Sequence, residues 1–141
     1  MKNFLLTTAM GATLATAAQG ETMTYVLDPP HSQIVFSYNH LGFSTTTGIF
    51  SGFEGSIELD QEDPAASSVS VSFPAKSLIT GWPAREEHFL SEDFFGAEAN
   101  PLVTFTSTSI EVTGEETGTI TGDLTMNGIT KSVVLDATLN Q

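Results

Sequence analysis

Cysteine is absent from this 141-residue chain. The chain can therefore form no disulfide, no thiolate nucleophile, no cysteine-ligated zinc site and no thioether link to haem. Its stability must come from the packing of a hydrophobic core. A chain of this length can bury such a core as one domain, and nothing in the length indicates two.

Positive charge is also scarce. Four Lys and Arg residues stand against 17 Asp and Glu residues, which gives a formal net charge of −13 at pH 7. A surface this acidic repels the phosphates of nucleic acids and anionic lipid headgroups. We therefore expect no nucleic-acid partner. The charge either provides solubility or forms a docking surface for a basic partner, and the sequence leaves both open.

The N-terminal segment has the composition of an export signal. Lys2 is the only charged residue before Glu21, and a short apolar run lies between them, with small residues at 15–17 and 18–20. A basic start, a short apolar stretch and an Ala-x-Ala end are typical of a secretory signal peptide. The run is short and rich in Thr, Ala and Gly, which disfavours a membrane-spanning helix. We predict a signal peptide at residues 1–20 and one secreted domain at 21–141.

Apolar and polar side chains alternate along most of the remaining chain, as in SVSVSF at 68–73. This period of two, broken by Gly, Asn and Pro, is typical of half-buried antiparallel sheet. Glycines inside the run 47–60 indicate bends such as those at barrel corners. We predict an all-β fold, an antiparallel β-barrel of about seven strands that need not close. The predicted strands span residues 23–27, 33–40, 47–60, 68–79, 102–113, 117–126 and 131–140.

One segment, residues 80–101, breaks the alternation. Pro83 suits the first position of a helix, and Glu86 and Glu87 suit its first turn. We predict one or two short helices around 83–95. The segment is unusually rich in large apolar side chains, so we expect it to plug or line an opening. These side chains are Trp82, Phe89, Leu90, Phe94 and Phe95.

The three histidines, His31, His40 and His88, are the first candidates for chemistry. His31 and His40 are an odd number of residues apart, so on a regular strand their side chains point to opposite faces. No HExxH spacing occurs, and DQED at 60–63 falls short of a calcium-binding loop. We predict no metal site. His31 and Asp28 are instead well placed to hydrogen-bond the backbone of a turn.

Sequence signatures of catalysis are also missing. The chain has no GxSxG element and no glycine-rich phosphate loop, and no carboxylate pair stands out among so many acidic residues. We predict that the protein is not an enzyme and requires no cofactor. An enzyme hypothesis would have to rest on the three histidines.

Ordered motifs give the chain a strong resemblance to the YceI-like family of polyisoprenoid-binding proteins. The pattern Y-x-(I/L)-D-x-x-H-S-x-(I/V)-x-F, a second His before L-G, and G-x-F-x-x-F-x-G are matched within 25–55. Later family motifs are matched by SLITG (77–81), REEHF (85–89), SEDFF (91–95), NPLVTFTST (100–108) and GDLTMNGITKSV (122–133). The match covers the whole chain after the predicted signal peptide.

The resemblance implies a lipocalin-like antiparallel barrel in the bacterial periplasm. Its pocket would hold a polyisoprenoid, an isoprenoid quinone or a similar apolar lipid, with transient membrane contact. His31 and His40 would then be residues typical of the family that anchor turns and strand ends. We expect the inward-facing residues to line this pocket, and we expect Trp82, Phe89 and Phe94 to lie near its mouth. The predicted ligand-binding residues are Ile34, Phe36, Tyr38, Phe53, Val71, Phe73, Phe105, Leu124, Met126, Trp82, Phe89 and Phe94.

Three departures from the family pattern accompany this prediction. Arg85 is followed by Glu86 where the family has Asp, and Phe89 replaces Leu. The chain ends at Gln141, where the family continues with closing strands, so we expect it to lack the C-terminal strands. Open edges of this kind favour dimerisation. The third departure is the strong acidity.

Two alternatives to a lipid carrier remain open from the sequence. The apolar residues could form a filled core with no cavity. The protein could also be an acidic interaction module that docks on a membrane cytochrome or another exported protein without bound lipid.

Overall fold

The computed structural model describes residues 21–140. The predicted signal peptide at residues 1–20 lies outside the described residues, as does Gln141. Residues 21–140 contain eight strands, one α-helix and three short 3-10 turns. The strands are β1 (Thr22–Val26), β2 (Ile34–His40), β3 (Ser44–Phe50), β4 (Glu54–Asp60), β5 (Ser68–Pro74), β6 (Leu102–Val112), β7 (Thr117–Met126) and β8 (Ile129–Thr138). The helix is α1 (Pro83–Leu90), and the 3-10 turns are Pro29–His31, Pro64–Ala66 and Ala75–Ser77.

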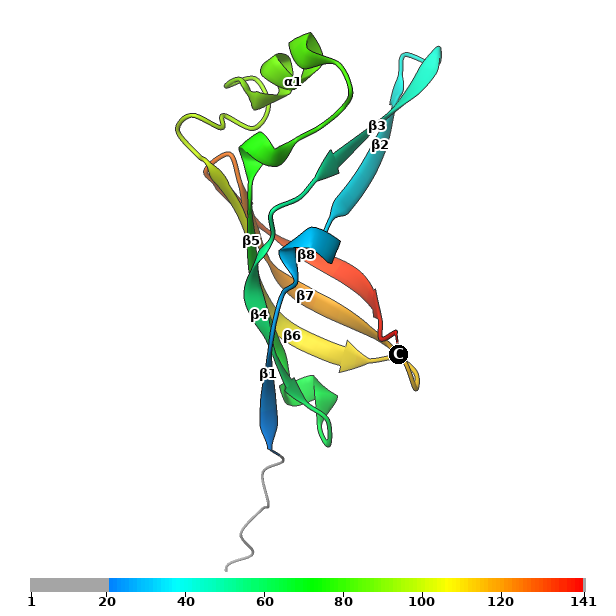
Figure 1. Cartoon of the computed structure of the whole chain (residues 1–141). Coiled ribbons are helices and arrows are strands. Elements are labelled where there is room, and N and C mark those ends of the chain that lie inside the picture. The colour runs from blue at the N-terminus through cyan, green and yellow to red at the C-terminus, as the bar shows by residue number, and fades with distance from the viewer. Residues whose placement is uncertain (1–20, 141) are drawn as a thin grey trace, which may run out of the picture.

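The strands form two antiparallel sheets. Six strands pair in the order β1-β4-β5-β6-β7-β8, and β2 and β3 form a separate hairpin. The hairpin and α1 extend beyond the same end of the large sheet and lie across from one another (Figure 1). Within residues 21–140, β1 and β8 are edge strands, so the sheet does not close. The predicted all-β antiparallel fold with an open barrel is confirmed.

The prediction of a single strand at 47–60 is wrong, because this segment belongs to two strands. β3 ends at Phe50 and β4 begins at Glu54. Between them Gly52 has a φ of +71°, a left-handed conformation that glycine adopts without steric cost. Alternation alone does not reveal this break, because the apolar pattern continues across it. The described residues therefore hold eight strands instead of seven.

Other predicted boundaries also change. The strand predicted at 68–79 ends at Pro74, and a 3-10 turn follows at Ala75–Ser77. Proline has no N–H to donate to a neighbouring strand, so it suits a strand end. The prediction of one or two short helices around 83–95 is confirmed by the single helix α1, and the residues after Ser91 form turns. This helix is not long and apolar enough to cross a membrane.

The core lies where the hairpin meets the large sheet and the segment after α1. Phe50, at the end of β3, packs against Phe73 of β5 and against Phe95, with ring centroids 5.2 and 5.3 Å apart. Phe53 packs against Phe73 at 4.7 Å. Aromatic contacts of this kind supply most of the apolar area that a chain without disulfides needs. The buried apolar residues among those described are Phe50, Phe53, Phe73, Ala75, Leu78, Ala97, Val103 and Phe105.

The hairpin is joined to the rest of the fold by few main-chain bonds. Ile49 and Ile79 exchange a pair of N–H to O bonds of 2.9 Å each, which form an isolated bridge. The N–H of Ser51, just after β3, donates to Oγ of Ser77 at 3.1 Å. Side-chain packing around Phe50 and between Tyr38 and Phe89 adds to this attachment. The hairpin thus stands as a separate wall beside α1.

Candidate functional site

One wall of the candidate site is a face of the β2–β3 hairpin. Phe36, Tyr38 and His40 alternate along β2, so their side chains share one face. The register places Thr46 opposite Tyr38 and Ser44 opposite His40. This face therefore has an aromatic half near the core and a polar half near the hairpin turn.

The opposite wall is α1 with the segments on either side of it. Arg85 and Phe89 are four residues apart, one turn of helix, and so lie on the same side of α1. Trp82 precedes the helix, and Phe94 and Phe95 follow it. Pro83 at the first helical position fixes where the helix begins. The wall is thus assembled from a single stretch of the sequence.

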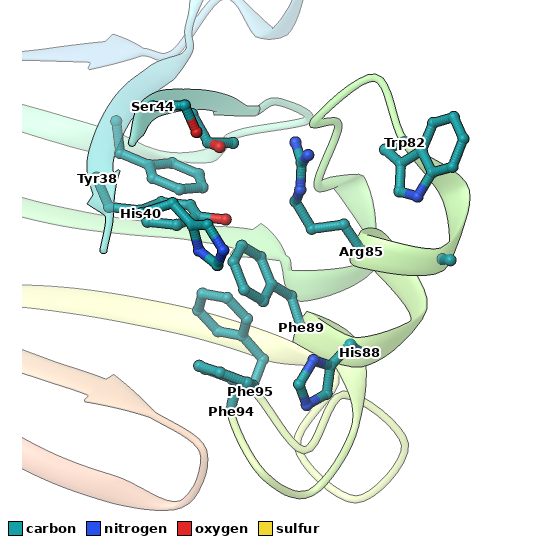
Figure 2. Close-up of a pocket in the computed structure, with 12 residues that line it drawn as sticks. Tyr38, His40, Ser44, Trp82, Arg85, His88, Phe89, Phe94 and Phe95 are labelled. Atoms are coloured by element: carbon teal, nitrogen blue, oxygen red, sulfur yellow. The ribbon is translucent and has the colours of Figure 1, made fainter. Parts of the chain in front are cut away.

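An open cleft with a volume of about 720 Å³ lies between the two walls. Small-molecule sites typically occupy about 300–1,000 Å³ and are lined mainly by apolar and aromatic groups. Figure 2 shows Arg85 and Phe89 directed toward the hairpin, whereas Trp82 lies at the outer side of the helix wall. The lining residues are Phe36, Tyr38, His40, Ser44, Thr46, Trp82, Ala84, Arg85, His88, Phe89, Phe94 and Phe95.

Aromatic rings form a continuous surface at the base of the cleft. Tyr38 of the hairpin meets Phe89 of the helix, with ring centroids 5.7 Å apart. Phe89 in turn packs against Phe94 at 5.0 Å. Phe36 stacks on the core residue Phe50 at 5.6 Å. The cleft is therefore an apolar surface continuous with the core but open to solvent.

Glu86 organises the backbone at the start of α1. Its Oε1 accepts hydrogen bonds from the N–H groups of Thr80 and Gly81, at 2.6 and 3.0 Å. These bonds stabilise the ionised carboxylate, chiefly through the Thr80 N–H, and so they lower the pKa of Glu86 below its usual value of 4.5. The carboxylate holds the loop that carries Trp82 against the helix.

The histidines are dispersed. Nδ1 of His31 lies 2.6 Å from Oδ2 of Asp28, within the turn before β2. Nε2 of His88 lies 3.6 Å from Oδ2 of Asp93, and His40 is at the end of β2. No group of three or more His, Cys, Asp or Glu residues in 21–140 is placed to hold a metal ion. His31 thus lies in a turn, where the sequence places it, whereas His40 and His88 line the cleft.

The structure divides the predicted ligand-binding residues into three groups. Phe36, Tyr38, Trp82, Phe89 and Phe94 line the cleft. Phe53, Phe73 and Phe105 are buried and do not line the cleft. Val71 of β5 and Leu124 of β7 pair with Phe105 from the two neighbouring strands, and they do not line the cleft either. Ile34 and Met126 are 39% and 40% exposed, away from the cleft. A ligand-binding role for any of the twelve stays a prediction.

Sequence reasoning did not identify the polar side of the cleft. It missed His40, Ser44, Thr46, Ala84, Arg85 and His88, whereas Phe95 was expected to plug or line an opening. A signal existed for some of them. The alternation that contains Phe36 and Tyr38 continues to His40, and the spacing of Arg85 and Phe89 is one helical turn. Which face of the strand meets the helix depends on the tertiary fold, and local patterns do not reveal that pairing.

Comparison of the sequence with known proteins identifies both a matching family and similar proteins. Residues 25–141 match the YceI-like domain. The chain is 37% identical to a UPF0312 protein of Pseudomonas savastanoi over 99% of its own length and 74% of the relative's. It is 40% identical to a UPF0312 protein of Photorhabdus laumondii, with 99% of this chain and 73% of that protein covered. The chain thus spans about three quarters of the length of these relatives.

Solved structures agree with the sequence matches. BcnA of Burkholderia cenocepacia superposes with a TM-score of 0.70 at 25% identity, over 77% of this chain and 69% of that one. The YCEI protein of Campylobacter jejuni superposes with a TM-score of 0.62 at 33% identity, over 79% of this chain and 66% of that one. Fold, motifs and relatives agree, and the chain belongs to the YceI-like family.

Proposed function

We propose that this protein is a periplasmic binding and carrier protein for a long-chain apolar lipid, an isoprenoid or a quinone-like molecule. The observation that carries the proposal is the aromatic cleft of about 720 Å³ between the hairpin and α1. The YceI-like family, known as a polyisoprenoid-binding fold, supplies the ligand class. The sequence of residues 1–20 supplies the export signal on which the location rests.

The energetics of binding favours a carrier that releases its lipid over a protein that binds the lipid irreversibly. Removing each methylene-sized group from water is worth about 0.8 kcal/mol, so several isoprene units would exceed the ceiling of about 21 kcal/mol for non-covalent binding. Such a lipid is supplied by a membrane and not by water. Transfer from the membrane to the cleft moves it between two apolar environments, so the net gain is small and release is feasible.

Binding in this proposal requires no chemistry on the ligand. The cleft residues hold an apolar chain, exclude water from it and release it unchanged. We therefore propose a non-enzymatic role. The partners that follow are the lipid, a membrane surface in transient contact, and a second copy of the chain paired through the open strand edges β1 or β8.

Native mass spectrometry, followed by organic extraction, tests the proposal on the mature chain purified from a bacterial host. A co-purifying lipid of fixed mass is the expected result, and Tyr38→Ala should deplete it. A ligand-free chain that also takes up no added isoprenoid alcohol from vesicles would overturn the proposal. Salt-sensitive association with a basic membrane protein, without lipid, would support the interaction module instead.

A further inference from the structure

Arg85 is the only arginine of the chain and one of three basic residues in 21–141, against 17 acidic ones. It is half-buried on the cleft side of α1. In Figure 2 its guanidinium points toward the hairpin, on the side where Ser44 lies, whereas Phe89 and Phe95 lie on the other side. The cleft thus has a cationic end and an aromatic end.

No carboxylate neutralises this arginine within residues 21–140. The ion pairs there join His31 to Asp28, Lys76 to Glu98 and His88 to Asp93. Glu86, its neighbour in sequence, is bound to the N–H groups of Thr80 and Gly81 instead. The guanidinium of Arg85 thus lies in the cleft without an ion pair among the described residues, although acidic residues are in large excess.

Most of the donors of Arg85 are also unused within the described part of the chain. A guanidinium has five N–H donors, and the one hydrogen bond found runs from Nη1 to the carbonyl oxygen of Thr80 at 3.4 Å. The other donors face the cleft, where the hydroxyl groups of Ser44 and Thr46 also lie. An acceptor entering the cleft would find several donors there.

Charge and shape together define that acceptor. The planar fork of a guanidinium fits the oxygens of a carboxylate or a phosphate in a bidentate manner. The net charge of −13 repels anions, and it repels multiply charged ones most strongly. One arginine compensates one negative charge. A singly charged head fits these conditions better than a diphosphate does.

We infer that the cleft selects apolar-chain molecules that carry a single carboxylate head, with Arg85 binding the head and the aromatic end of the cleft holding the chain. This inference rests on the proposed function, and among its apolar lipids it favours one with a carboxylate head over a quinone or an alcohol. It makes Arg85 a specificity-determining residue. It also fixes the direction in which the ligand lies, with its head between α1 and the polar half of the hairpin.

Three probes with the same chain and different heads test the inference: farnesol, farnesoic acid and farnesyl diphosphate. Trp82 is the only tryptophan and lines the cleft, so its fluorescence reports binding directly. Charge-assisted hydrogen bonds are roughly twice as strong as neutral ones, so the acid should bind about ten-fold more tightly than the alcohol. The diphosphate should bind more weakly than the acid.

Substitutions assign the preference to Arg85. Arg85→Gln should reduce the ratio of acid to alcohol affinity to about one, and Arg85→Lys should restore part of the ratio. Lys76→Gln is the matched control, because it removes one positive charge from a surface pair with Glu98 and not from the cleft. That control should keep the wild-type ratio.

The outcomes separate this inference from the proposed function. Equal binding of acid and alcohol, or an equal loss of preference in Lys76→Gln, overturns the head-group assignment while the lipid-binding proposal stands. Tightest binding of the diphosphate overturns the single-charge conclusion. Failure of all three probes to bind overturns the proposed function itself.

Discussion

The side-chain Nδ2 of Asn127 donates a hydrogen bond of 2.8 Å to the main-chain oxygen of Phe94. Asn127 lies in the β7–β8 turn, with a φ of 50°, and Phe94 lies on the wall of the cleft. Oδ1 of Asn127 also accepts from Nδ2 of Asn100 at 3.2 Å. A turn of the large sheet thus fixes the position of an aromatic residue of the site.

Asn127→Gly should destabilise the protein by about 1–2 kcal/mol, because it removes both side-chain bonds while glycine keeps the left-handed backbone. Urea unfolding should show a lower midpoint at an unchanged slope. Asn127→Asp is the companion variant, since it keeps the acceptor and loses the donor to Phe94. An unchanged midpoint in Asn127→Gly would show that this turn does not support the site.

Gly48→Ala should displace the ring of Phe36. The two residues are register partners in the hairpin, and a methyl group at Gly48 would collide with that ring. We expect a cost of about 1–3 kcal/mol, as for other overpacked sites, together with weaker lipid binding. Adding Phe36→Leu should recover part of the stability but not the binding. Full stability in the single variant would contradict the close packing.

Cleft and core residues should respond differently to truncation. Phe73→Ala removes a buried ring and should cost about 3–5 kcal/mol. Tyr38→Ala, on the half-buried wall of the cleft, should cost about 1 kcal/mol and reduce farnesol affinity about ten-fold. Urea unfolding and Trp82 fluorescence separate the two effects. Equal loss of stability in both variants would mean that the cleft is part of the core.

Glu86 should give the folded state a specific pH dependence. Its pKa is lowered on folding, so its contribution to stability is fully present above the unfolded value of 4.5 and is lost as the pH falls through the lower folded value. The stability difference between wild type and Glu86→Gln should therefore be constant near neutral pH. It should shrink as the pH is lowered below 4.5 and through the lower folded-state pKa.

Chemical unfolding at several pH values measures this difference. Glu87→Gln serves as the control, since Glu87 is the exposed neighbour on the same helix. A difference between wild type and Glu86→Gln that does not vary with pH would mean that the bonds to Thr80 and Gly81 do not depend on the ionised carboxylate.

Alternation was sufficient to predict most of the fold. The runs around Val71 and Phe105 have a period of two, and each became a strand of the large sheet. The glycines inside 47–60 indicated a bend, but the segment was predicted as one bent strand, because the left-handed residue Gly52 interrupts the strand without changing the hydrophobic pattern. Local pattern thus located strands better than it located the bend between them.

The site was harder to predict than the fold. The aromatic half of the cleft followed from composition, because a polar segment with Trp82, Phe89 and Phe94 needs an apolar environment. Phe73 and Phe105 have the same alternating context as Phe36, yet they lie in the core. Only the tertiary arrangement separates a ring that fills the core from a ring that lines a cleft.

The few main-chain bonds between the hairpin and the rest of the fold have a thermodynamic consequence for a carrier. A ligand that contacts both walls would complete the packing of the hairpin, so its binding free energy would add to folding stability. At a ligand concentration about 100 times Kd, this linkage is worth about 2.7 kcal/mol. The loaded protein would then resist proteolysis and amide exchange at β2 and β3 more than the empty one does. The supply of lipid would thus govern how long the carrier survives.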